Sequence, residues 1–151
     1  MKKVLIALDY DPTAQKVAEH GFALAKSMNA GVLLLHVVAD QTYYANLNYS
    51  GIMGFYGNDL YALTSKESLI KTALQFLDKT KDHLGENNIE ILAEEGDFPD
   101  VIMDIAKKHK ADIIVLGTHS KRWLEKILMG SVTEKVLQET TLPLFIVPTK
   151  K

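Results

Sequence analysis

The chain has 151 residues, enough for one domain with a buried core. A net charge of −2 gives no reason to expect a nucleic acid or an anionic membrane as partner. The absence of cysteine excludes disulfides, thiolate catalysis and cysteine-ligated metal centres. The apolar run at residues 4–8 ends at Asp9, too soon for a signal or membrane segment, so we expect a cytoplasmic protein.

Short apolar runs alternate with amphipathic stretches along the chain. The runs that predict strands are residues 4–8, Gly31–Val38, residues 89–93, residues 112–116 and Leu144–Val147. The stretches that predict helices run from about residue 12 to 28, from 64 to about 84, from 98 to 109, and over Ser131–Glu139. Residues 123–128 have the spacing of a further short helix.

Several of these helix starts carry recognisable capping residues. Asp11 can cap the first helix, with Pro12 at its first position, where no N–H partner is needed. The second begins with the capping box Thr64-Ser65-Lys66-Glu67. Asp97 is expected to cap the third, with Pro99 in its first turn.

Alternating helices and continuously apolar strands predict an α/β fold, a parallel sheet covered by helices on both faces. Because crossovers are right-handed, sharing the helices between two faces requires the strand order to reverse somewhere. Ligands of such sheets bind at the carboxyl ends of the strands beside that reversal. If the first and fourth strands are neighbours there, Asp9 and residues 117–120 share one crevice.

The segment Leu116-Gly117-Thr118-His119-Ser120 follows the fourth strand, and Gly130-Ser131 opens the last helix. A glycine-containing loop that leads to a helix N-terminus can bind phosphate through outward N–H groups and the helix dipole. Ser131-Val132-Thr133-Glu134 is also a capping box, so Ser131 has a structural role open to it as well. The two roles are compatible, since a cap leaves other N–H groups available.

Asp9 and Asp11 could instead form a metal pair, but Asp11-Pro12 fits a helix start better. That leaves Asp9 as the one carboxylate without a structural explanation, and no metal site is predicted. His36 and the other histidines outside the loop lack the spacing of metal ligands and are expected to be structural or solvated.

Taken together, these pieces resemble the universal stress protein family over nearly the whole length. The resemblance rests on the first strand ending in Asp9, on His36-Val37-Val38, on Glu95-Gly96-Asp97-Phe98-Pro99, on residues 111–119, and on Pro143-Leu144-Phe145-Ile146-Val147-Pro148. The resemblance implies that residues 1–151 form one domain. It also implies a three-layer α/β fold with a doubly wound, five-stranded parallel sheet in the order 3-2-1-4-5, like that of the adenine nucleotide alpha hydrolases.

Nucleotide-binding members of that family carry Gly, two residues, Gly, nine residues, then Gly-Ser or Gly-Thr. Gly117, Gly130 and Ser131 are in register with this motif, whereas Ser120 replaces its second glycine. The resemblance implies that Asp9 meets the ribose or adenine and the backbone of Val38 the adenine edge. It assigns the phosphates to Gly117, Ser120, Gly130, Ser131 and Val132, and Leu116 belongs to the same predicted nucleotide site. His119 lies in the loop, where it could contact a phosphate. If position 120 needs a positive φ, serine costs about 1 kcal/mol there, less than a tenfold change in affinity.

Residues 39–63 have no clear periodicity and are long for a loop in a compact domain. They contain five of the six tyrosines. One interpretation is a surface excursion with no binding role. The other is a binding role, as a lid, a dimer contact or a contact for a partner protein, and aromatic side chains suit each of these roles.

The favoured function is a stress-response regulatory module that binds ATP or another adenine nucleotide, with Mg²⁺ as a possible companion. The alternative is a nucleotide-independent interaction protein of the same fold. A response-regulator receiver fits poorly, because no phosphoacceptor aspartate directly follows the third strand. No general base is recognisable beside the loop, so an enzyme is not predicted. Leu144–Val147 would be an apolar edge strand, and by the resemblance it predicts a homodimer.

Overall fold

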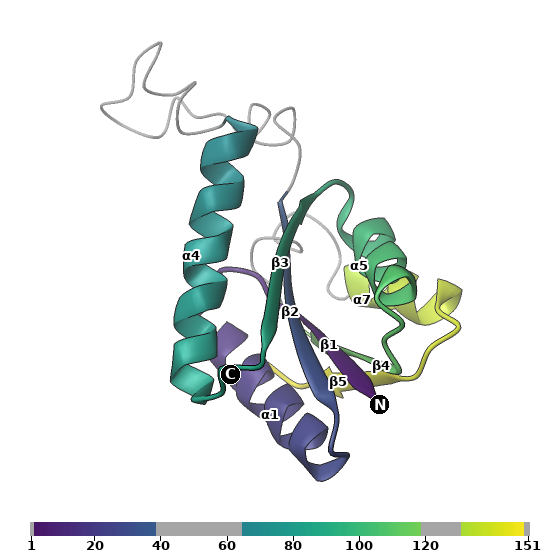
Figure 1. Ribbon diagram of the computed structural model, residues 1–151. Helices are drawn as coiled ribbons and strands as arrows, with labels where there is room; N and C mark the ends of the chain where they lie inside the picture. Colours follow the sequence, from purple (N-terminus) through teal and green to yellow (C-terminus); the bar gives the residue numbers. More distant parts are fainter. Residues whose placement is uncertain (1, 39–64, 119–130, 150–151) are drawn as a thin grey trace.

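A computed structural model describes residues 2–38, 65–118 and 131–149, and for residues 131–133 it describes the backbone alone. In chain order the elements are β1 (Lys3–Ala7), α1 (Ala14–Ser27), β2 (Gly31–Val38), α4 (Lys66–Leu84), β3 (Glu90–Glu95), α5 (Phe98–Lys108), β4 (Ile113–Gly117), α7 (Ser131–Glu139) and β5 (Leu144–Val147) (Figure 1). The segment 39–63 and the short helix expected at 123–128 lie outside the described residues.

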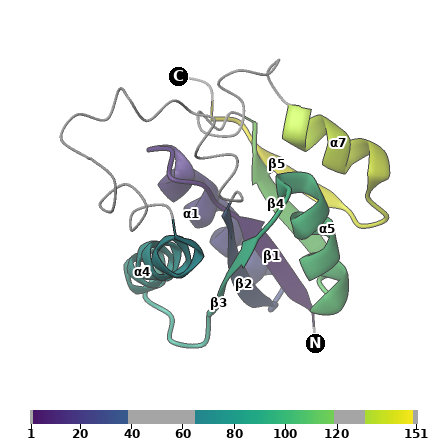
Figure 2. The ribbon, with the colours of Figure 1, turned by 90° about the horizontal axis from the view of Figure 1, so that it is seen from above.

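The five strands form a parallel sheet in the order β3-β2-β1-β4-β5. Helices α1 and α4 cover one face, and α5 and α7 cover the other (Figure 2). The helices therefore change face between α4 and α5, and the strand order reverses between β1 and β4. The predicted fold class, strand order and layers are confirmed.

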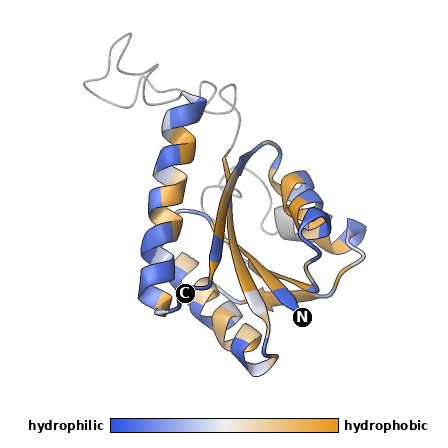
Figure 3. Cartoon of the chain, viewed as in Figure 1, coloured by the Kyte–Doolittle hydropathy of each residue, from blue (hydrophilic) through white to orange (hydrophobic). Residues whose placement is uncertain are grey.

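Two apolar clusters, one on each face of the sheet, hold the three layers together. Leu34 of β2 and Leu77 of α4 belong to the first cluster, and Leu5 of β1 and Ile102 of α5 to the second. Successive residues of one strand point to opposite faces, so β1 and β2 supply both clusters. Figure 3 shows the corresponding pattern, with hydrophobic strands and with helices that are polar on their outer sides.

Two helix starts differ from the prediction. Helix α1 begins at Ala14, two residues later than expected, because Asp11 Oδ1 accepts hydrogen bonds from the N–H and the hydroxyl of Thr13, at 2.9 and 2.6 Å. These contacts form a turn ahead of the helix. Helix α4 is capped by Ser65, whose hydroxyl accepts the N–H of Ser68 at 3.3 Å, so the cap lies one residue after Thr64.

Candidate functional site

Asp9 and Gly117 lie at the carboxyl ends of neighbouring strands. Strand β1 pairs with β4 in a register that joins Ile6 to Val115, and the chain reaches Asp9 and Gly117 shortly after this pair. The adjacency of the first and fourth strands, on which the shared crevice depends, is confirmed. His119, Ser120 and Gly130 lie outside the described residues, so their roles stay predictions.

The Asp9 carboxylate is buried, and the turn that follows β1 is built around it. Asp9 is 6% exposed, and its Oδ1 accepts the N–H of Asp11 at 3.1 Å. Asp11 in turn holds Thr13 at the start of α1. The aspartate predicted to contact the nucleotide is therefore held by the same turn that begins the first helix. No group of three or more possible metal ligands occurs among the described residues, Asp9 and Asp11 included.

His36 fixes the main chain just before Asp9. Its Nδ1 lies 2.7 Å from the carbonyl oxygen of Leu8, so this nitrogen carries the proton and donates it. The Leu8 N–H donates to the Leu35 carbonyl at 2.8 Å, which ties both backbone groups of Leu8 to β2. The imidazole also lies 4.3 Å from the ring of Tyr10, centroid to centroid. His36 has the structural role expected, but its partner could not be read from the sequence, because it depends on the β1–β2 register.

Val38 ends β2, and its carbonyl accepts a hydrogen bond from the residue that follows β3. The Gly96 N–H donates to the Val38 oxygen at 2.9 Å. Gly96 has φ of +148°, and a Cβ built there would lie 2.6 Å from Val101 Cγ2, so this position requires glycine. A carbonyl has two lone pairs, so the Val38 oxygen has the capacity for a second donor.

Gly117 lies where the backbone approaches its neighbours too closely for a side chain. A Cβ built on it would lie 2.9 Å from Val17 Cγ2 and 3.1 Å from Thr149 Cγ2. The glycine at this position therefore has a packing reason of its own, independent of any ligand. Sequence reasoning assigned it to phosphate approach alone, because the contact with α1 is invisible before the chain folds.

We expect Gly117→Ala to lower the free energy of unfolding by about 1–3 kcal/mol in the absence of any ligand, because the new methyl overpacks this contact. Val17→Ala removes the nearer atom, so the double variant should lose less than the sum of the two single variants. Urea unfolding of all four proteins measures this coupling. A Gly117→Ala protein as stable as the wild type would show that the glycine does not serve packing.

Ser131 and Val132 begin α7, which starts where the predicted loop ends. Their side chains are outside the described part, and so is any capping contact of Ser131.

Helix α7 is linked to α5 through Lys135, whose Nζ lies 3.5 Å from Asp100 and 3.9 Å from Asp97. The Asp100 charge raises the pKa of Lys135. Asp97 is the N-cap of α5 as predicted, but its side chain makes no capping hydrogen bond.

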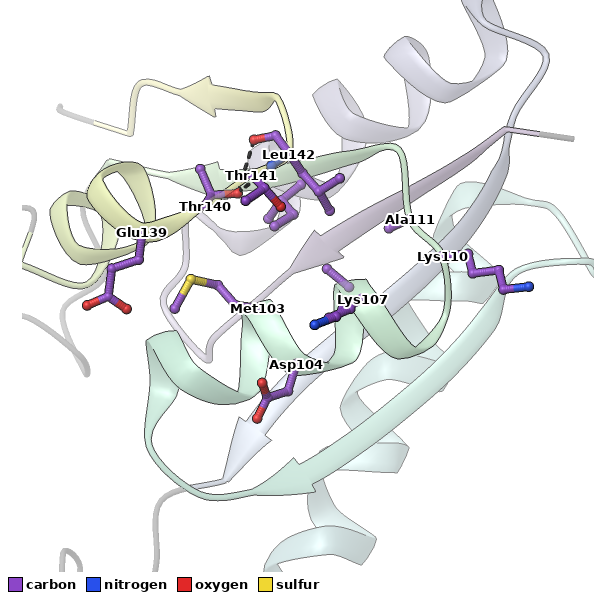
Figure 4. Close-up of a pocket in the computed structure, with 11 residues that line it drawn as sticks. Met103, Asp104, Lys107, Lys110, Ala111, Glu139, Thr140, Thr141 and Leu142 are labelled. Atoms are coloured by element: carbon purple, nitrogen blue, oxygen red, sulfur yellow. Dashed lines mark hydrogen bonds between the residues drawn. The ribbon is translucent and has the colours of Figure 1, made fainter.

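A separate pocket of about 410 Å³ opens at the opposite end of the sheet. Figure 4 shows Met103, Asp104 and Lys107 on α5, with Glu139 at the end of α7 and Leu142 just before β5. Parallel α/β sheets bind their ligands at the carboxyl ends of the strands, and this pocket lies at the amino ends of β4 and β5. Its position therefore does not match the place where such a sheet is expected to bind a ligand.

Known proteins are similar to nearly the whole of this chain, in sequence or in fold. Universal stress protein MJ0531 of Methanocaldococcus jannaschii is 32% identical over 152 residues, which cover 99% of this chain and 84% of that protein. The solved structure of protein MJ0577 is 26% identical with a TM-score of 0.73 and covers 99% of this chain and 97% of its own. A universal stress protein solved in complex with cAMP is 19% identical, with a TM-score of 0.68, over 99% and 98% of the two chains.

Among the described residues, no helix is long and apolar enough to cross a membrane.

The family model described as the universal stress protein family matches residues 1–148. That match, the sheet order and the relative at 32% identity agree with the motifs quoted from the sequence. The chain belongs to the universal stress protein family.

Proposed function

We propose that this chain is a stress-response regulatory module that binds ATP, or another adenine nucleotide, at the carboxyl ends of β1 and β4. The observation that carries the proposal is the placement of Asp9 and Gly117 at the carboxyl ends of neighbouring strands, at the point where the strand order reverses. Helix α7, which begins at Ser131, brings a helix N-terminus after the same loop. The relative solved with cAMP, an adenine nucleotide, supports this choice of ligand class.

The described residues fit an adenine nucleotide chemically. A carboxylate offers about four acceptor positions, so Asp9 can accept a ribose hydroxyl while it holds the Asp11 N–H. The Val38 carbonyl can accept from the adenine edge. In this proposal Leu116 and Gly117 begin the phosphate side, which His119, Ser120, Gly130, Ser131 and Val132 complete. Mg²⁺, where present, would be bound to the phosphates.

Ser120 motivates a second candidate function, an interaction protein that needs no nucleotide. In that case residues 39–63 would contact a partner protein, and a pulldown unchanged by deleting residues 43–60 would count against it.

The nucleotide proposal also makes a prediction about Ser120. If position 120 needs a positive φ, Ser120→Gly should bind ATP more tightly, by less than about tenfold, because glycine avoids the steric cost that serine has there. Weaker binding by this variant would indicate that the serine hydroxyl contacts the phosphates.

The proposal includes no catalytic role, and slow ATP hydrolysis is not predicted. It places the protein in the cytoplasm as a homodimer that pairs through β5, with no nucleic acid or membrane partner. β5 ends the sheet, and Leu144, Phe145 and Ile146 on it are partly exposed. A strictly monomeric mass in solution at micromolar concentration would contradict the dimer.

The nucleotide proposal is tested by identifying what the protein carries. Freshly purified protein is denatured, and the released small molecules are analysed by mass spectrometry. We expect ATP, ADP, AMP or a cyclic adenine nucleotide in an amount that approaches one per chain. Release of a guanine nucleotide or a flavin in that amount would contradict the assignment to adenine.

A further inference from the structure

The chain segment after β5 is bound to the start of the predicted phosphate loop. In the β4–β5 register Gly117 pairs with Val147, and the next N–H, that of Thr118, donates to the Val147 carbonyl at 3.0 Å. The Thr149 N–H then donates to the hydroxyl oxygen of Thr118 at 3.0 Å. The main chain of Thr118 is therefore held by Val147, the last residue of β5, and its side chain by Thr149, two residues later.

Packing reinforces these two hydrogen bonds. Thr149 is 4% exposed, and its methyl group is one of the two atoms that leave no space for a side chain on Gly117. Between Val147 and Thr149, the Pro148 carbonyl accepts the ammonium of Lys16 on α1 at 2.7 Å. The segment is thus fixed from α1 and from β4, directly beside the residue where the loop begins.

We propose that Thr118 is a positioning residue for the nucleotide, acting through its link to Thr149 rather than by touching the ligand. Its N–H donates to Val147 and its hydroxyl oxygen accepts from Thr149, so these groups are directed toward β5. Loop N–H groups bind phosphate well only when they are already held in place, because ordering a loop on binding costs affinity. This inference rests on the proposed nucleotide site, and it adds the residues that follow β5 as the support that holds Thr118, where the loop begins.

The chain offers a matched control at the other end of β5. The Thr140 hydroxyl donates to the Leu142 carbonyl at 3.0 Å and accepts the Leu142 N–H at 2.9 Å (Figure 4). Thr140→Val and Thr118→Val each remove one threonine hydroxyl that accepts a backbone N–H. Thr140 lies beside the pocket at the amino ends of the strands, far along the sheet from Asp9. The two variants should lose comparable stability and differ in their effect on ATP.

The test compares wild type, Thr118→Val, Thr118→Ser and Thr140→Val by ATP titration and by hydrogen exchange of the nucleotide-free proteins. We expect Thr118→Val to weaken ATP binding about tenfold. Thr118→Ser, which keeps the hydroxyl, should restore it to within about threefold, and Thr140→Val should bind like the wild type. Peptides that contain Thr118 should exchange faster in Thr118→Val alone.

The outcomes separate this inference from the function on which it rests. Wild-type ATP affinity in Thr118→Val, or an equal loss in Thr140→Val, overturns the inference while the nucleotide site stands. Unchanged exchange around Thr118 in Thr118→Val overturns it without reference to any nucleotide. A wild type that binds no ATP, with faster exchange in Thr118→Val, overturns the proposed function and the positioning role while the structural link stands.

Discussion

Replacing Asp9 with asparagine is expected to weaken ATP binding about ten- to a hundredfold, the range expected for losing a hydrogen bond to a charged group. Asparagine keeps an oxygen that can accept the Asp11 N–H, so the turn into α1 should survive. It removes the negative charge and puts a donor where a ribose hydroxyl would need an acceptor. The affinity of each protein is measured by equilibrium titration with ATP.

Asp11→Asn is the matched control for this variant. Asp11 is buried in the same turn, at 8% exposure against 6% for Asp9. Its Oδ1 accepts hydrogen bonds from Thr13, and the proposed site gives it no contact with the nucleotide. The control removes the same charge two residues away, so its ATP affinity should change by less than about threefold. Equal losses in the two variants would mean that the charge of the whole turn matters, rather than a contact of Asp9.

Replacing Gly21 with leucine is expected to lower the free energy of unfolding by about 3 kcal/mol or to prevent folding. Gly21 lies on the buried side of α1, and a Cβ built there would lie 2.7 Å from Ile6 Cδ1 and 3.1 Å from Val115 Cγ1. Helix α1 therefore crosses β1 and β4 at a distance that leaves no space for a side chain. Because β1 and β4 carry the candidate site, moving this helix would also disturb the site.

Gly85→Ala is the control for Gly21→Leu. Gly85 caps α4 with φ of +78°, and a Cβ built there would meet no atom within 4 Å. Its replacement should cost only the backbone strain of the left-handed conformation, about 1 kcal/mol. Urea unfolding measures both variants, and a Gly21→Leu protein no less stable than Gly85→Ala would contradict the close packing of α1.

The strands and helices could largely be predicted because their patterns are local. The bounds of β2, β5 and α7 agree with the sequence to the residue, since apolar runs and helical spacing need no knowledge of the rest of the chain. Strand β3 was expected at residues 89–93 and lies at Glu90–Glu95, because its pairing with β2 continues over Glu94 and Glu95. Tertiary pairing decided that strand's end.

The candidate site could be predicted in its position but not in its supports. Asp9 and Gly117 were recognisable from motifs and from the rule that ligands bind where strand order reverses. The hydrogen bond from His36 to Leu8 and the link between Thr118 and Thr149 join residues far apart in the sequence. Such contacts depend on which strands become neighbours and in which register, and no local pattern records that.

The central claim, that this chain binds an adenine nucleotide beside Asp9 and Gly117, is tested most directly by calorimetric titration of the nucleotide-free protein with ATP and Mg²⁺. We predict saturable binding of one ATP per chain, and much weaker binding by Asp9→Asn under the same conditions. Absence of binding at millimolar ATP, or saturable binding that Asp9→Asn leaves unchanged, would contradict it.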